Sequence, residues 1–148
     1  FEHLNIKDEV REVFEYYEAW AEEQNVVLSL SGDCPGLLGD KSMLRRALSN
    51  LVSNAIDHTT QGKSVEVSLR STDDKFLITI ENCGKEIAAE QLPRIFDRFY
   101  QADPSRQRQG AGLGLAIVKS IIEVHNGSIS ATSDKGITRF EVKLPIIV

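Results

Sequence analysis

The chain is poor in cysteine and in positive charge, and it has no long apolar run. Its only cysteines, Cys34 and Cys83, are far apart and form no CxxC pair, which argues against a zinc site and favours a reducing, cytoplasmic setting. The 22 acidic residues outnumber 17 Lys and Arg, and this net charge of -5 argues against general nucleic-acid binding. Because no run approaches a membrane span and no signal peptide opens the chain, we expect that this fragment does not enter the membrane.

The composition that is present is typical of one soluble globular domain. The chain has 148 residues, 41% of them hydrophobic and 26% charged, which is enough for a real core and argues against disorder. No repeat, low-complexity run or linker divides it, so we expect one domain over residues 1–148. It begins at Phe1 and not at methionine, as an excised fragment does, so the missing membrane segment says nothing of a parent protein.

The strongest local pattern predicts a helix from Leu44 to Thr59, around which the chain is organised. Apolar residues recur through it at helical spacing, and Asp40 is its expected N-cap. Asn50, Asn54 and His58 recur every fourth residue and therefore share another face. Because asparagine disfavours a helix interior, this face is expected to meet something polar, although a solvated face explains the asparagines alone equally well.

Periodicity also predicts the other elements of an α/β domain. Two further helices are expected at Asn5–Glu23, with Asn5 as N-cap, and at Leu113–His125. Strands are expected at Val26–Leu30, Leu37–Leu38, Ser64–Leu69, Phe76–Ile80, Ser128–Ser133 and Arg139–Leu144. The segment Gln101 to Gly110 is polar with little to bury, so we expect a mobile loop there.

Two glycine-bearing segments are candidates to contact a ligand. Gly110 to Leu115 (GAGLGL) enters the last helix, where backbone N–H groups can approach an anion and the helix N-terminus favours phosphate. A tight turn explains it equally well, and it is neither a dinucleotide fingerprint nor a Walker loop, because it follows a polar loop and lacks GK[ST]. Asn82 to Ile87 leaves a strand with Gly84 at its start and could aim a polar side chain into a cleft, but alone it is more simply a plain loop.

Taken together, five motifs in a fixed order resemble a known family. They are N-x-x-x-N-A (Asn50, Asn54, Ala55), the glycine turn Asn82 to Ile87, F-x-x-F-Y (Phe96, Phe99, Tyr100), G-x-G-L-G-L (Gly110 to Leu115) and G-x-T-x-F (Gly136, Thr138, Phe140). The series resembles the catalytic and ATP-binding domain of bacterial sensor histidine kinases, within the gyrase, Hsp90 and MutL ATP-binding superfamily. The resemblance covers nearly the whole chain, and the runs LPRIFDRFY, DPSRQ and GLGLAIVKSI look most like the heavy-metal (copper/silver-type) sensors.

The resemblance implies a fold and a place for the nucleotide. We expect a two-layer α/β sandwich with a mixed, mostly antiparallel sheet of about five main strands and about three helices on one face. ATP is expected between the central helix and the glycine-rich helix, under a lid running from about Ala88 to Gly110.

Individual roles follow from the same resemblance. Asn54 is implied to hold Mg²⁺ through its amide oxygen, Asn50 to face the phosphates and Thr138 to lie near the adenine. Arg98 and Arg106 are candidates, with Arg108, to neutralise phosphate charge, although solvated loop charge explains Arg106 and Arg108 equally well. The other residues implied to line the nucleotide are Asp57, His58, Asn82, Gly84, Ile87, Phe96, Phe99, Tyr100, Gly110, Gly112, Leu113, Gly114 and Leu115.

Several positions depart from the family pattern. Asn82 stands where an Asp accepts a hydrogen bond from the adenine amino group, so that contact lacks a charge. Glu86 replaces a glycine and puts the flexibility of its loop in doubt, and Ile137 replaces another glycine. Asp57 stands where a Lys or Arg is common, and His58 where an aromatic residue is common. Together these differences predict modest nucleotide affinity.

Three functions fit this pattern: a histidine kinase domain, an ATP-hydrolysing switch of the gyrase or Hsp90 kind, and a nucleotide-sensing module without chemistry. The hydrolysing relatives carry at the Asn50 position a Glu that acts as general base on water. Asparagine cannot accept that proton, whereas phosphoryl transfer to an imidazole needs mainly positioning and charge neutralisation. The sequence therefore favours the kinase.

The phosphoacceptor is not expected within this chain. Its histidines are His3, His58 and His125, and none has the H-E-x-x-x-P context of the family. His125, at a helix end, is expected to serve as a partner of the helix dipole. We therefore expect a monomeric, cytoplasmic fragment of a bacterial inner-membrane sensor, whose partners are a separate dimerisation and phosphoacceptor domain and, indirectly, a response regulator.

Overall fold

The computed structural model describes residues 1–98 and 114–146. The predicted helices and strands occur in the predicted order, and the structure adds β1 and a short 3₁₀ helix. The elements are β1 (Glu2–Leu4), α1 (Ile6–Glu23), β2 (Val27–Gly32), β3 (Leu37–Gly39), α2 (Lys41–His58), β4 (Ser64–Ser71), β5 (Lys75–Cys83), the 3₁₀ helix η1 (Leu92–Arg94), α3 (Gly114–Val124), β6 (Ser128–Asp134) and β7 (Ile137–Pro145). In the described residues, no helix is both long and apolar enough to cross a membrane.

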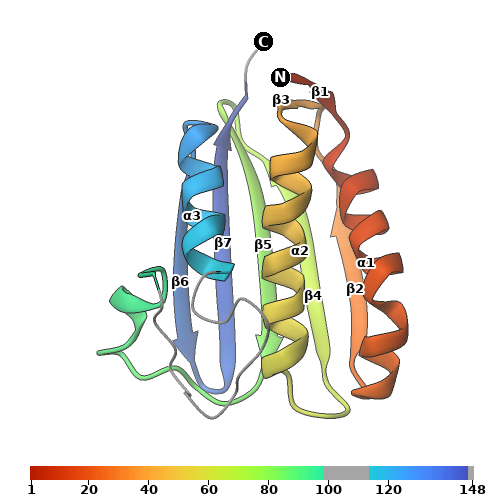
Figure 1. Ribbon diagram of the computed structural model, residues 1–148, viewed down its shortest axis with the longest axis vertical. Coiled ribbons are helices and arrows are strands. Elements are labelled where there is room, and N and C mark those ends of the chain that lie inside the picture. The colour runs from red at the N-terminus through yellow and green to blue at the C-terminus, as the bar shows by residue number, and fades with distance from the viewer. Residues whose placement is uncertain (99–113, 147–148) are drawn as a thin grey trace.

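The main sheet has five strands in the order β2-β4-β5-β7-β6, shown in Figure 1. β2 pairs with β4 in parallel and the other neighbours pair antiparallel, so the predicted mixed, mostly antiparallel sheet is confirmed. A separate pair joins β1 to β3. Strand β1 was not predicted, because three residues are too short to show a period.

Both predicted N-caps are present at the starts of the first two helices. The Asn5 side chain accepts a hydrogen bond from the backbone N–H of Asp8 at 3.3 Å, and Asp40 accepts one from Met43 at 2.9 Å. Because Asp40 is the cap, α2 begins at Lys41, before the first residue of the apolar stripe. Asn25 follows the end of α1 with a φ of 56°, a conformation that stops a helix.

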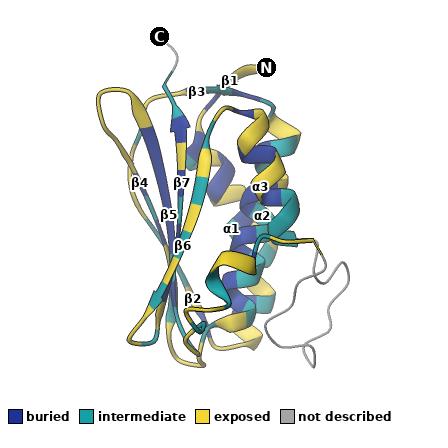
Figure 2. Ribbon diagram, turned by 90° about the vertical axis from the view of Figure 1, so that its left-hand side faces the viewer, coloured by how far each residue is buried: buried dark blue, intermediate teal, exposed yellow. Residues whose placement is uncertain are grey.

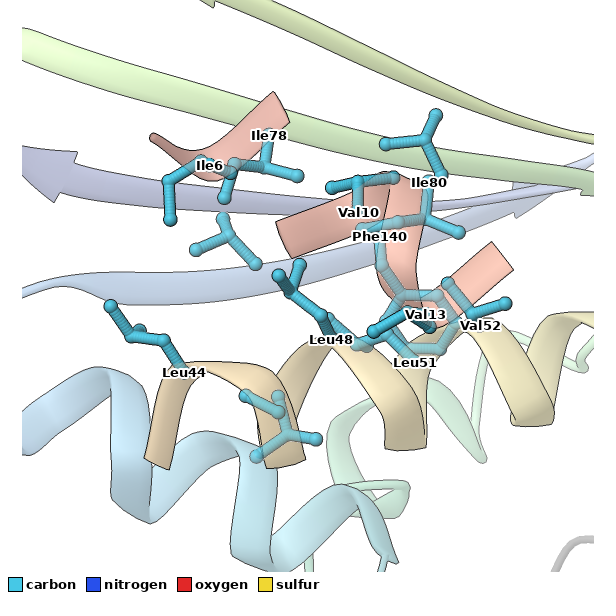
Figure 3. Packing of buried hydrophobic residues seen from close by; sticks show 14 of the residues in the cluster. Ile6, Val10, Val13, Leu44, Leu48, Leu51, Val52, Ile78, Ile80 and Phe140 are labelled. Atoms are coloured by element: carbon cyan, nitrogen blue, oxygen red, sulfur yellow. The ribbon is translucent and has the colours of Figure 1, made fainter. Parts of the chain in front are cut away.

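The three α-helices lie on one face of the main sheet and leave the other face open, as Figure 2 shows. α2 is central: it packs against α1, α3 and β5. Leu51 and Ala55, from the predicted apolar stripe, are at most 1% exposed. Burial of this apolar surface against the sheet is the main source of stability. Figure 3 labels part of this core: Ile6, Val10, Val13, Leu44, Leu48, Leu51, Val52, Ile78, Ile80 and Phe140.

His125 lies at the end of α3, as expected, and contacts the start of α2. Its ring is buried, and Nδ1 lies 2.8 Å from the carbonyl oxygen of Ile121 while Nε2 accepts the backbone N–H of Asp40 at 3.0 Å. His125 thereby joins the end of α3 to the start of α2.

Candidate functional site

Three chain segments lie at one end of the layered structure, the lower end in Figure 1: the end of α2, the end of β5 and the turn between β6 and β7. The start of α3 lies above them, beside the middle of α2. Thr59 pairs with Gly84 in an isolated bridge, and the Thr60 N–H donates to the Cys83 carbonyl at 2.9 Å. These contacts bring the polar face of α2 beside the last residues of β5.

Gly84 is needed because two backbones approach closely. A Cβ atom at this position would lie 2.0 Å from the carbonyl oxygen of His58. No side chain fits at that distance, so only glycine lets β5 end against the last turn of α2. The predicted turn at Gly84 is therefore present, but β5 continues to Cys83 and not only to Ile80.

A row of polar side chains ends the inner face of the sheet, which is otherwise apolar. Asn82 of β5 is opposite Thr138 of β7, which is opposite Ser133 of β6. Asn82 is 4% exposed and Thr138 5% exposed, and the Thr138 and Ser133 hydroxyl oxygens lie 3.0 Å apart. Within residues 1–98 and 114–146, the Asn82 amide has no hydrogen-bond partner. The Asn82 amide and the two hydroxyls therefore form a row of hydrogen-bonding groups that suits a ligand with a polar edge.

The two asparagines of α2 are half-buried on the face that approaches α3. The Asn50 amide donates to the carbonyl oxygen of Gly114 at 3.3 Å and so joins the two helices. Asn54, one turn later on the same face, has no hydrogen-bond partner for its side chain in the described part of the chain. His58 Nε2 lies 4.0 Å from a carboxylate oxygen of Asp57, in the last turn of α2. The structure therefore brings the predicted α2 residues to the same end of the molecule as Asn82 and Thr138.

The start of α3 is open on the side of Gly114. A Cβ atom there would meet no heavy atom of the described chain within 4 Å, so nothing in the fold itself requires glycine. Backbone N–H groups at a helix start favour anions, and glycine lets a phosphate approach them. Leu115, the next residue, is half-buried and packs against the core.

We predict that Gly114→Ala separates stability from binding. The substitution should raise the free energy of unfolding by up to about 1 kcal/mol, because alanine favours the helix. It should weaken Mg-ATP binding about tenfold if phosphate approaches this backbone, a loss of about 1.4 kcal/mol. Urea denaturation and calorimetry would measure both, with the exposed Ser120→Ala in the same helix as control. Unchanged affinity in Gly114→Ala would show that phosphate does not approach here.

The segment after β5 is held to the sheet by an aromatic contact. The Phe96 ring meets the Phe140 ring edge-on, with ring centroids 6.0 Å apart. The backbone N–H of Ile87 donates to the Ser133 hydroxyl at 2.8 Å. Arg98 is exposed at the end of this described segment. The nucleotide contacts predicted for Phe99, Tyr100, Arg106, Arg108, Gly110, Gly112 and Leu113 lie outside the described residues.

The residues available for a metal suit Mg²⁺ bound together with phosphate. Among the described residues, no group of three His, Cys, Asp or Glu side chains could hold an ion. Mg²⁺ commonly takes only one or two protein oxygens and completes its shell with water and substrate phosphates, so the unpartnered Asn54 amide fits that use.

Burial, with Asp33 nearby, raises the pKa of the Cys34 thiol to about 11, so this thiol stays protonated at neutral pH and is a poor nucleophile or ligand.

Sequence reasoning missed Ser133. It belongs to the inner face of β6 after Ile129 and Ala131, and this alternation could have identified it as a polar residue at an inward position. The role of Glu86 was also missed: its carboxylate accepts the backbone N–H of Lys135 at 2.7 Å.

Comparison with known proteins agrees with this geometry. The chain is 51% identical over 144 residues to the sensor histidine kinase CusS of Escherichia coli (strain K12), covering 96% of this chain and 30% of CusS. It is 51% identical over 109 residues to the probable sensor kinase SilS of Salmonella typhimurium, covering 72% of this chain and 22% of SilS. The chain thus spans less than a third of the length of these relatives.

Solved structures show the same fold. The catalytic domain of the histidine kinase ThkA superposes with a TM-score of 0.87 at 27% identity, covering 98% of this chain and 95% of that one. ShkA, solved at full length in complex with AMPPNP, superposes with a TM-score of 0.86 at 26% identity, over 99% of this chain and 31% of ShkA. The structure of ThkA in complex with the response regulator protein TrrA superposes with a TM-score of 0.84 at 25% identity, covering 99% of this chain and 42% of that one.

These findings confirm the predicted α/β fold and the resemblance to the heavy-metal sensor kinases. A family model described as histidine kinase-, DNA gyrase B- and HSP90-like ATPase matches residues 39–147. The chain therefore belongs to the histidine kinase-, DNA gyrase B- and HSP90-like ATPase family.

Proposed function

We propose that this chain binds Mg-ATP and transfers its γ-phosphoryl group to a histidine on a separate dimerisation and phosphoacceptor domain. The observation that carries the proposal is that the face of α2 with Asn50 and Asn54 lies beside the end of β5, where Asn82 and Thr138 are buried. Asn82 and Thr138 suit the base, while the start of α3 suits the phosphates. Mg²⁺ would be held by Asn54 with phosphate oxygens, and when bound it neutralises phosphate charge.

The chemistry of Asn50 favours transfer over hydrolysis. Its amide donates a hydrogen bond to Gly114 and cannot take a proton from water, so it is not a general base. An imidazole acceptor needs no such base, because its neutral ring nitrogen is already a nucleophile. The site then has to position the phosphoryl group and neutralise its charge.

The likeness to larger sensor kinases supports further partners. ShkA was solved with AMPPNP, an ATP analogue, and ThkA with a response regulator. We propose that this chain, a monomer by itself, acts as the cytoplasmic catalytic part of a bacterial inner-membrane sensor. A response regulator would then receive the phosphoryl group from the acceptor histidine.

A transfer assay tests this function. The chain alone should turn over radiolabelled ATP hardly at all, because it has neither a base for water nor an acceptor. Mixed with the dimerisation domain of the same protein, it should label one histidine there. That label should be lost in acid and kept in alkali, as phosphohistidine is. Replacing the acceptor histidine with glutamine provides the matched control and should abolish labelling.

Two results would reject the kinase proposal. Sustained hydrolysis by the chain alone, with no labelling of the histidine domain, would indicate an ATP-hydrolysing switch. Tight nucleotide binding with neither hydrolysis nor labelling would indicate a nucleotide-sensing module.

A further inference from the structure

The turn between β6 and β7 has an unusual residue at a left-handed position. Asp134 pairs with Ile137, and the two residues between them, Lys135 and Gly136, have φ values of 52° and 79°. A two-residue hairpin turn with both central φ angles positive suits the twist of the strands, and Asn or Gly usually supplies it. Gly136 adopts that conformation freely, whereas a lysine at positive φ is strained. Lys135 therefore needs support from outside the hairpin.

Glu86 supplies that support from the loop after β5. One carboxylate oxygen accepts the backbone N–H of Lys135 at 2.7 Å. The sheet ladder resumes at Asp134 and Ile137, so the N–H of Lys135 has no strand partner and is available to the carboxylate. Its length is that of an ordinary N–H···O hydrogen bond, which either a carboxylate or an amide oxygen can accept.

Two more bonds fasten the same loop to the same hairpin. The Gly84 N–H donates to the Gly136 carbonyl at 2.8 Å, and the Ile87 N–H donates to the Ser133 hydroxyl at 2.8 Å. Glu86 lies between these two points. The loop is thus bound to the hairpin through three residues, and the side-chain hydrogen bond of Glu86 is the middle contact.

The hairpin, whose strand β7 pairs with β5 as far as Cys83 and Ile137, also carries most of the polar row. Ser133 lies against Thr138, and Thr138 is the register partner of Asn82. A shift of the hairpin relative to the end of β5 would move these hydroxyls relative to the Asn82 amide. Hydrogen bonding to a ligand is sensitive to such shifts, because it depends on both distance and angle.

We propose that Glu86 is a positioning residue that fixes the tip of the β6–β7 hairpin, beyond the last pair of the β5–β7 ladder, against the loop after β5 and so sets the polar row for the nucleotide base. This inference rests on the proposed nucleotide binding. Glu86 acts on the base part of the ligand through Lys135 and the hairpin, and it does not touch the phosphates. A glycine at position 86 would leave the loop flexible. The carboxylate of Glu86 instead orders the loop, so the base site is rigid before the ligand binds.

Calorimetry with Mg-ATP and with adenosine, which lacks phosphates, tests the assignment. Glu86→Ala should weaken both ligands by the same factor, about fivefold, because the loss concerns the base. Glu86→Gln should stay within about twofold of the parent, since an amide oxygen still accepts the Lys135 N–H. Glu66→Ala, an exposed glutamate of β4 outside the site, should bind as the parent does. Hydrogen exchange of the Gly84 and Ile87 amides should quicken in Glu86→Ala alone.

The outcomes separate this inference from the proposed function. Parental affinity for both ligands in Glu86→Ala would overturn the positioning role and leave nucleotide binding intact. If Glu86→Ala and Glu86→Gln lost the same affinity, the effect would come from the charge of Glu86, and the positioning role would be overturned as well. A parent that binds neither ligand would overturn both proposals.

A second variant keeps the test informative if the Glu86→Ala protein folds poorly. Adding Lys135→Gly relieves the strained turn, because glycine adopts positive φ freely. Stability should return while affinity stays low. Recovery of affinity in this double variant would show that only the conformation of the turn matters, and it would overturn the positioning role.

Discussion

Asn54→Ala is expected to lower the Mg²⁺-dependent affinity for ATP by at least about 100-fold, because even indirect supports of a metal ligand are worth about 10- to 100-fold. The amide of Asn54 is half-buried and has no hydrogen-bond partner in the described part of the chain, so the fold does not use it. Alanine is the best helix former, and the variant should therefore unfold at the same temperature as the parent or slightly above it.

The measurement is calorimetry with an ATP analogue, in Mg²⁺ and in EDTA. The affinities of the parent and of Asn54→Ala for the analogue should differ strongly in Mg²⁺ and little in EDTA, since the lost amide acts on the ion. Arg46→Ala, at an exposed position of the same helix, controls for changes in α2 and should bind as the parent does. Parental binding of Mg-ATP by Asn54→Ala would show that the metal is not held there.

Phe140→Ala should produce the largest loss of stability, about 3–5 kcal/mol. Phe140 is 2% exposed, pairs with Ile80 across the sheet and meets the Phe96 ring. Its removal leaves a cavity that the neighbouring strands cannot fill, and it takes away the aromatic contact that holds the segment after β5. Since domains are stable by only about 5–15 kcal/mol, this loss is a large share of the total.

Urea denaturation measures the loss, and hydrogen exchange at Ile95 and Phe96 should report release of their segment before global unfolding. The matched control is Ile137→Ala in the same strand, because Ile137 faces outward and is 43% exposed. It should cost less than about 1 kcal/mol. If Phe140→Ala costs no more than the control, Phe140 is not a centre of the core.

Local periodicity was enough to predict most of the secondary structure. The stripe of α2 and its cap at Asp40 are properties of neighbouring residues, so they can be recognised without the fold. The same holds for Asn50 and Asn54, because residues four apart in any helix share a face. The sequence alone therefore predicts this polar face of α2, but not the elements that pack around it.

The end of β5 was predicted wrongly for a physical reason. The strand was expected to stop at Ile80, because Glu81 and Asn82 are polar. In the structure Asn82 is an inward residue and is buried, so the strand continues to Cys83. A polar residue at an inner position resembles the start of a loop until the layer that covers it is known.

The helices, the hairpins and the asparagine face can be derived from the amino-acid sequence alone, since each depends on residues close together in the chain. The distant groups that meet at the site are brought together by the fold. Asn50 reaches Gly114 across 64 residues, and Glu86 reaches Lys135 across 49. Such contacts depend on strand order and register, here the parallel pairing of β2 with β4 and the place of β6 at the edge. No local pattern encodes them, because register is set by the burial of a whole face of the sheet and not by any single pair.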